Sequence, residues 1–94
     1  MREYKTVAGL LSDPSRWCKG AMAKETRGGS SCSILDGKMF CLYGAIERVY
    51  QDMNKRYEVV GKVRKLLGRD IIEFNDARRR THAEVLAVVK KARI

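Results

Sequence analysis

Apolar residues recur at steps of three and four along three segments of this chain, which is the spacing of one face of an α-helix. The first set is Met39, Leu42, Ile46, Val49 and Met53. The second set is Val59, Val60, Val63, Leu66 and Leu67. The third set is Val85, Leu86, Val89 and Ala92. The spacing predicts three helices, with a break between the first two at residues 52–54.

Capping residues stand where these helices should begin and end. Thr81 is followed three residues later by Glu84, which predicts a capping box in which each side chain binds a backbone N–H group of the other's turn. Asp36 precedes the first set and is predicted to cap its first turn. Gly68 follows the second set and predicts a left-handed C-terminal residue. We therefore expect well-defined helix ends.

The N-terminal quarter is less regular. Residues 7–11 predict a short helix, and Asp13 with Pro14 predicts the start of another that continues past Trp17 to Ala21. The Gly-Ala pairs at residues 20–21 and 44–45 indicate two helices that cross closely. Residues 27–31 read as a loop, and residues 71–74 as a short extended piece between helices.

The length of 94 residues suits a single domain over residues 1–94. We expect an all-α fold, a compact domain of four or five short helices. No run of about 18 apolar residues is present, so neither a transmembrane helix nor a membrane partner is expected. The N-terminus lacks the apolar core of a signal peptide, and three cysteines are an odd number for a disulfide framework. These features predict a cytoplasmic protein with reduced thiols.

Positive charge is concentrated in the second half. The net charge is +9, of which residues 1–46 carry +3 and residues 47–94 carry +6. A basic excess favours contact with a polyanion, although Lys-rich and Arg-rich helix faces are also ordinary solvated surface. Arg78, Arg79 and Arg80 stand immediately before a predicted helix N-terminus, where phosphate is attracted. Alternatively, these arginines form a solvated cluster that pairs with Asp70, Glu73 or Asp76.

The residues predicted to bind nucleic acid or an acidic protein surface are Arg78, Arg79, Arg80, Lys62, Lys65 and Lys90. No cofactor and no small-molecule substrate is expected, and the oligomeric state stays open. The tyrosines at positions 43, 50 and 57 recur at seven-residue steps, which favours a packing seam between helices over a base-stacking stripe.

Two chemical alternatives were weighed. Cys41 near a helix start, with His82 as base and Asp76 as its partner, could form the nucleophilic set of a Cys-dependent hydrolase. A buried, inert Cys41 inside the predicted helix is the favoured interpretation, and the only histidine is expected to be exposed. Cys18, Cys32, Cys41 and His82 lack the paired spacing of zinc ligands, so no metal is expected.

Three motifs carry a resemblance to a known family. They are a Trp-x-x-Gly-Ala-x-Ala segment at residues 17–23, Cys-Leu-x-Gly-Ala at residues 41–45, and Asn-Asp at residues 75–76 leading into Arg-Thr-x-x-Glu-Val at residues 80–85. The chain resembles, over residues 7–93, a domain-of-unknown-function family of small bacterial and phage proteins. Phe40 and Phe74 stand where the family often has Trp, which keeps an aromatic side chain but no indole N–H.

The resemblance implies no enzyme class or cofactor. It implies a phage or mobile-element origin, where small proteins are often regulators or inhibitors of host defence such as anti-CRISPR proteins. Together the sequence predicts a non-enzymatic binding protein whose partner is nucleic acid or an acidic protein surface. The alternative is the Cys-dependent hydrolase.

Overall fold

The computed structural model describes residues 3–94, and helices dominate that part of the chain. The elements are α1 (Val7–Leu11), a 3-10 turn η1 (Pro14–Arg16), β1 (Ala23–Lys24), β2 (Met39–Phe40), α2 (Leu42–Val49), α3 (Met53–Leu67), α4 (Ile71–Asp76) and α5 (His82–Ala92). The prediction of a helical fold with four or five short helices is confirmed. Of the helices in residues 3–94, none is both long and apolar enough to cross a membrane.

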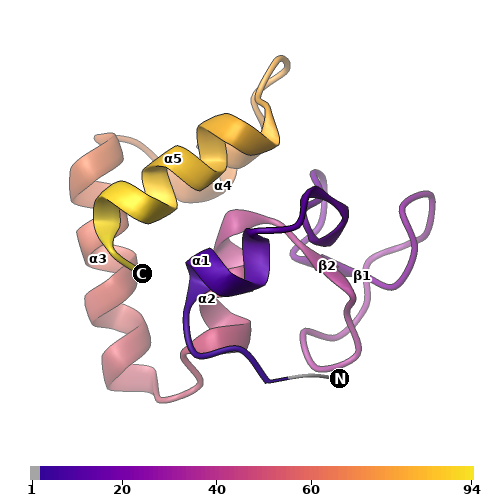
Figure 1. Cartoon of the computed structure of the whole chain (residues 1–94), viewed down its shortest axis with the longest axis horizontal. Coiled ribbons are helices and arrows are strands. Elements are labelled where there is room, and N and C mark those ends of the chain that lie inside the picture. The colour runs from indigo at the N-terminus through magenta and orange to yellow at the C-terminus, as the bar shows by residue number, and fades with distance from the viewer. Residues whose placement is uncertain (1–2) are drawn as a thin grey trace.

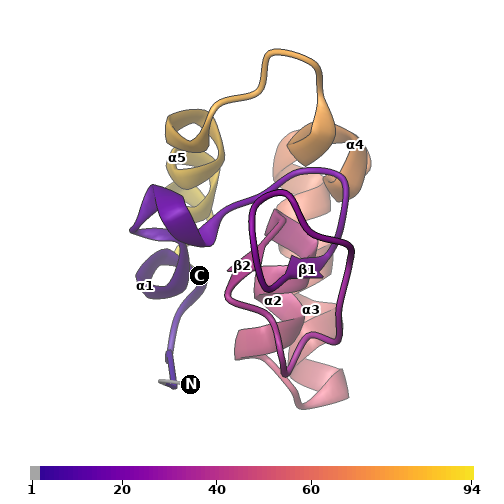
Figure 2. The ribbon, with the colours of Figure 1, turned by 90° about the vertical axis from the view of Figure 1, so that its right-hand side faces the viewer.

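The helices form two layers around one core. Figure 2 shows α1 and α5 on one side of the molecule, and α2, α3 and α4 on the other. In Figure 1, α3 stands at the left edge and the short β1–β2 ribbon lies at the opposite side. Both α1 and α3 contact α5, and α2 contacts α1, α3 and α4. Side chains between the layers are fully buried, among them Val7, Leu10, Leu11, Leu42, Ile46, Val63, Val85 and Val89.

The predicted Gly68 end of α3 and the predicted capping box of α5 are present, and the start of α3 has a cap at a position predicted only as a break between helices. Asp52 begins α3 by accepting a hydrogen bond from the N–H of Lys55 at 2.9 Å. Gly68 ends that helix with φ of 67°, a left-handed conformation that costs glycine little. Thr81 and Glu84 form the capping box of α5, with both reciprocal hydrogen bonds made. The sequence signals at Gly68 and at Thr81 with Glu84 therefore locate these two helix ends correctly.

The start of α2 was predicted wrongly. The helix begins at Leu42 rather than near Met39, and its N-cap is Cys41 rather than Asp36. Residues 39–40 are instead extended, because they pair antiparallel with residues 23–24. The last member of the same apolar set, Met53, belongs to α3 and is exposed, since the Asp52 cap starts a new helix there.

The helix expected from Pro14 to Ala21 is also absent. Asp13 and Pro14 begin only the 3-10 turn η1, with Asp13 as its N-cap. The backbone is already extended at Trp17. Gly20 then takes φ of 81°, which is incompatible with a helix. The close approach predicted at Gly44 is real, although its partner is the extended backbone of Met22: an added Cβ on Gly44 would overlap the Met22 carbonyl oxygen.

Two further predictions need correction. Residues 71–74 were expected to be extended, yet they lie in α4, which Asp70 caps through the N–H of Glu73 at 2.9 Å. Burial of Ile71 and Phe74, three residues apart, holds this helix on the core. The tyrosine seam exists at positions 43 and 50, which pack on the core, but Tyr57 is exposed because it lies beyond the break, on α3.

Candidate functional site

The arginine triplet begins in a tight turn between α4 and α5. The N–H of Arg80 donates to the carbonyl of Ala77 at 2.9 Å, so Arg78 and Arg79 occupy the two central positions of the turn. Both side chains are exposed. Within residues 3–94 neither side chain forms a hydrogen bond or ion pair, and the alternative pairing of these two arginines with Asp70, Glu73 or Asp76 is not formed.

Arg80 is held inside the molecule. Its Nε donates to the carbonyl of Phe74 at 2.8 Å, and its guanidinium lies 3.9 Å from the centre of the Phe74 ring. Its Nη1 pairs with Glu84 at 3.5 Å, and only 18% of the side chain is exposed. The N–H of Thr81 lowers the pKa of Glu84, which keeps this carboxylate ionised beside Arg80. Arg80 therefore connects the start of α5 to α4, and it differs in this respect from Arg78 and Arg79.

The three predicted lysines lie away from that turn. Lys62 and Lys65 are exposed on α3, and Lys90 is exposed in the last turn of α5. Because an α-helix rises about 1.5 Å per residue, the length of α5 puts Lys90 on the order of 12 Å or more from the turn at Arg78 and Arg79. The structure thus separates the predicted residues into a turn group and a group on α3 and the end of α5.

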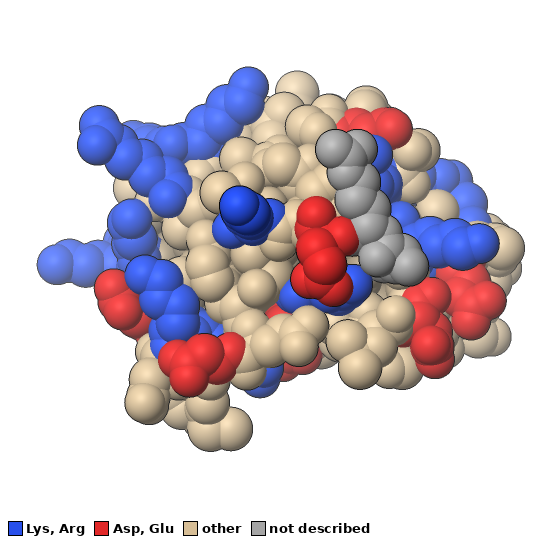
Figure 3. Space-filling view, turned by 60° about the horizontal axis from the view of Figure 1, so that its bottom comes forward, with Lys and Arg blue, Asp and Glu red and all other residues tan. Residues whose placement is uncertain are grey.

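A wider pattern was missed by the sequence. Between residues 62 and 93, all the lysines and arginines except Arg80 are exposed and make no hydrogen bond or ion pair through their side chains to the described residues. We call these nine residues the unpaired cations: Lys62, Arg64, Lys65, Arg69, Arg78, Arg79, Lys90, Lys91 and Arg93. In Figure 3 positive side chains gather on the left, where Figure 1 places α3 and the end of α5.

The described arginines before residue 57 are engaged differently, although the side chains of Lys5, Lys24 and Lys38 make no hydrogen bond or ion pair to the described residues either. Arginines 16, 48 and 56 each form an ion pair, and Arg27 donates to backbone carbonyls. After residue 57, most acidic side chains form ion pairs, cap helices or accept hydrogen bonds from backbone N–H groups. Among the described side-chain carboxylates there, only that of Glu73 makes no hydrogen bond or ion pair. Formal charge alone shows the excess but not which cations are unpaired, so the sequence carried no signal for this difference.

The three residues of the hydrolase alternative, Cys41, His82 and Asp76, are not hydrogen-bonded to one another among the described residues. Cys41 is buried, its Sγ accepts from the N–H of Gly44 at 3.3 Å, and burial raises the pKa of its thiol to about 11. His82 was expected to be exposed, but it is half-buried with Nε2 2.5 Å from the carbonyl oxygen of Leu11. Asp76 accepts from the N–H of Gly20 at 3.2 Å.

Asn75 has a larger role than the predicted turn. It is fully buried at the end of α4. Its Oδ1 accepts from the indole N–H of Trp17 at 2.6 Å and from the N–H of Leu42 at 3.0 Å. Its Nδ2 donates to the carbonyl of Cys18 at 3.1 Å and to Asp76 at 2.9 Å. Asn75 therefore connects the three sequence motifs by hydrogen bonds. These contacts give the motif residues a role in holding the fold together that does not require catalysis.

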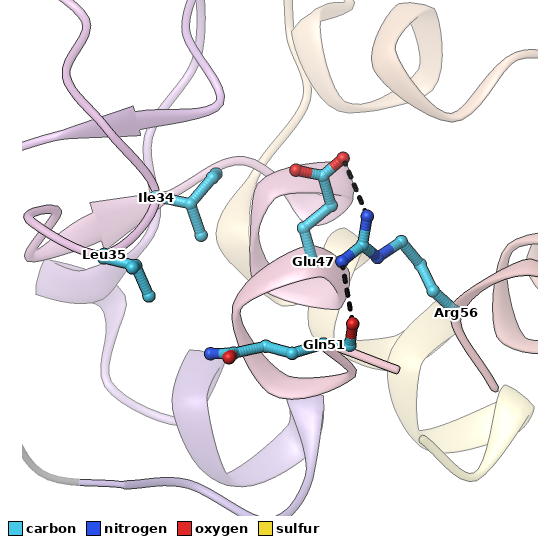
Figure 4. A pocket seen from close by; sticks show the side chains of 5 residues that line it. All are labelled: Ile34, Leu35, Glu47, Gln51 and Arg56. Atoms are coloured by element: carbon cyan, nitrogen blue, oxygen red, sulfur yellow. Dashed lines mark hydrogen bonds and ion pairs between the residues drawn. The ribbon is translucent and has the colours of Figure 1, made fainter. Parts of the chain in front are cut away.

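Metal-binding and ligand-binding features are sparse. All three cysteines are free thiols, and residues 3–94 contain no group of three His, Cys, Asp or Glu side chains placed to hold a metal. A surface pocket of about 280 Å³ is lined by Ile34, Leu35, Glu47, Gln51 and Arg56. Figure 4 shows that Arg56 spans it, pairing with Glu47 at 3.9 Å and donating to the Gln51 carbonyl at 3.2 Å. Its charged groups therefore satisfy each other.

Comparison with known proteins identifies the family. The model of a family of unknown function (DUF6197) matches residues 3–93. Because the match covers nearly the whole chain, the protein belongs to that family, and the resemblance drawn from the three motifs is confirmed in this respect. No curated protein and no solved structure matches the chain. The phage or mobile-element origin stays a prediction.

Proposed function

We propose that this member of a family of unknown function is a non-catalytic protein that binds nucleic acid through its unpaired cations. The observation that carries the proposal is the concentration of unpaired cations between residues 62 and 93. The described arginines before residue 57 make contacts within the fold, and only three described lysines there lack a partner, whereas nine exposed cations between residues 62 and 93 have no side-chain partner among residues 3–94. Such side chains displace counterions from phosphates and supply most of the affinity for a nucleic-acid backbone.

The composition of this surface favours nucleic acid over an acidic protein. Protein interfaces usually centre on desolvated aromatic or apolar anchors. The most exposed large apolar side chains, Leu35, Met53 and Tyr57, lie in the 34–35 segment and at the start of α3. Between residues 62 and 93, the segment that carries the unpaired cations, the exposed large apolar side chains are Leu66 and Ile72. Their exposed fractions are smaller than those of Leu35, Met53 and Tyr57. A cationic surface with few anchors suits a phosphate backbone.

Binding should depend little on base sequence. Contacts from Lys and Arg to phosphates position a protein but do not read bases. The exposed positions of α5 are Ala83, Glu84, Ala87, Lys90 and Lys91. None is an Asn, Gln or Arg. Lys90 and Lys91, which could also contact a guanine, stand only in the last turn, and Glu84 is engaged by Thr81 and Arg80. We therefore expect duplexes of different sequence to bind with similar affinity.

Removing Arg78 and Arg79 together should weaken binding of a mixed-sequence DNA fragment by about tenfold or more at low salt, because two phosphate contacts are lost. The measurement is fluorescence anisotropy on Arg78→Ala/Arg79→Ala. The matched control is Lys24→Ala/Lys38→Ala, which removes two charges near the β1–β2 ribbon and should change the affinity by less than about twofold.

Two outcomes would oppose the proposal. An equal loss in both variants would mean that binding follows net charge rather than this surface. If neither DNA nor RNA bound at low salt, the nucleic-acid proposal would fail and an acidic protein partner would become the better explanation. Because none of these four side chains makes a hydrogen bond or ion pair with residues 3–94, circular dichroism should show both variants folded.

A further inference from the structure

The outward side of α5 is lined by small side chains. Ala83 and Ala87 are exposed and lie four residues apart, so they share one face of the helix. Val85 and Val89 are fully buried on the opposite side, against α1 and α3. In Figure 2 α5 lies at the surface on the side facing away from α4 and α3, with α1 beside it. A surface that contacts this face can therefore approach the helix closely.

Unpaired cations stand at both ends of this alanine face. Arg78 and Arg79 precede the helix in the tight turn, and Lys90, Lys91 and Arg93 follow at its end. The helix has 11 residues, which corresponds to a length of about 16 Å at 1.5 Å per residue. The major groove of B-form DNA is about 12 Å wide and admits an α-helix. A helix of this length that crosses the groove places its two ends over the two backbones.

We propose that the ligand of α5 is double-stranded DNA, with the Ala83–Ala87 face turned into the major groove and the cations at the two helix ends on opposite phosphate backbones. This inference rests on the proposed function and narrows it to one class of nucleic acid. Double-stranded RNA is excluded from this arrangement because the major groove of an A-form helix is too deep and narrow to admit side chains. Single strands offer no groove at all.

The one acidic side chain on this part of α5 does not oppose the arrangement. Glu84 accepts from the N–H of Thr81 at 2.9 Å and pairs with Arg80 at 3.5 Å. Its negative charge is therefore directed at the helix N-terminus and at an internal guanidinium rather than at a phosphate. The alanine methyl groups can touch thymine methyl groups in the groove, which adds contact area but little discrimination between sequences.

The test introduces negative charge into the alanine face. We expect Ala83→Glu/Ala87→Glu to weaken binding of a 20-base-pair DNA duplex by about tenfold or more, because like charges would face phosphates across the groove. Both positions are exposed helix positions where Glu is well tolerated, so the variant should fold. The matched control, Ser33→Glu/Asn54→Glu, adds two charges at exposed sites outside α5 and should change the affinity less than about twofold.

The outcomes separate this inference from the proposed function. If Ala83→Glu/Ala87→Glu binds the duplex as well as the control does, while Arg78→Ala/Arg79→Ala still loses affinity, α5 does not enter the groove and the general proposal survives. Equal affinity for the duplex and for either of its separated strands would overturn the groove arrangement in the same way. Absence of binding to any DNA or RNA would instead remove the proposed function itself.

Discussion

Asn75→Ala is expected to lower the free energy of unfolding by about 3–4 kcal/mol, a large share of the stability of a domain of this size. The substitution leaves three buried groups without their partner: the indole N–H of Trp17, the N–H of Leu42 and the carbonyl of Cys18. A buried donor or acceptor without a partner costs about 1–3 kcal/mol, and these three are not fully independent. Urea denaturation followed by circular dichroism measures the loss.

Two other variants calibrate this result. Trp17→Phe removes one donor and keeps the other contacts of Asn75, so we expect a loss of about 1–2 kcal/mol. Asn54→Ala changes an exposed asparagine in the first turn of α3 and should alter stability by less than about 0.5 kcal/mol. If Asn75→Ala were no more destabilising than Asn54→Ala, Asn75 would not connect the N-terminal segment, α2 and α4 as described.

Gly44→Ala should destabilise the protein by about 3 kcal/mol, at the upper end of the usual range for overpacking. An added Cβ would overlap the carbonyl oxygen of Met22 and lie 2.7 Å from its carbonyl carbon. These are backbone atoms, so a change of side-chain rotamer cannot relieve the contact. Either α2 or the strand segment must move, which disturbs the pairing of Phe40 with Ala23.

The same substitution at Gly61 is the control, and its expected sign is opposite. Gly61 lies within α3 and is exposed, and a Cβ built there meets nothing within 4 Å. Alanine has a higher helix propensity than glycine by about 1 kcal/mol, so Gly61→Ala should stabilise the protein. Thermal or urea unfolding of both variants compares the two directly. A stabilising Gly44→Ala would contradict the close packing of α2 on the Met22 backbone.

The start of α5 and the end of α3 could be predicted from sequence, and segments held by tertiary contacts could not. The Thr81 and Glu84 capping box and the Gly68 terminus act locally, so residue identity is enough to place them. Trp17 was expected in a helix, but its extended backbone bridges to Phe40, a contact with a residue more than twenty positions away. Asn75 looked like a turn residue because its partners on two other segments are invisible in the local sequence.

The candidate surface was only partly predictable for a related reason. The sequence located Arg78 and Arg79 correctly as exposed, yet treated Arg80 as their equivalent. The structure separates them, because Arg80 binds the Phe74 carbonyl and Glu84. Likewise, nothing in composition shows that the described arginines before residue 57 make internal contacts while most of those after it do not. Pairing depends on side-chain geometry, which only the fold supplies.

The dependence of DNA affinity on salt tests the central claim most directly. The intact protein is titrated against a mixed-sequence duplex from about 50 to 300 mM salt, and log Kd is plotted against log salt. If four to six of the unpaired cations contact phosphates, the association constant should fall with a log–log slope of about −4 to −5. A flat dependence, or no binding at the lowest salt, would contradict the account.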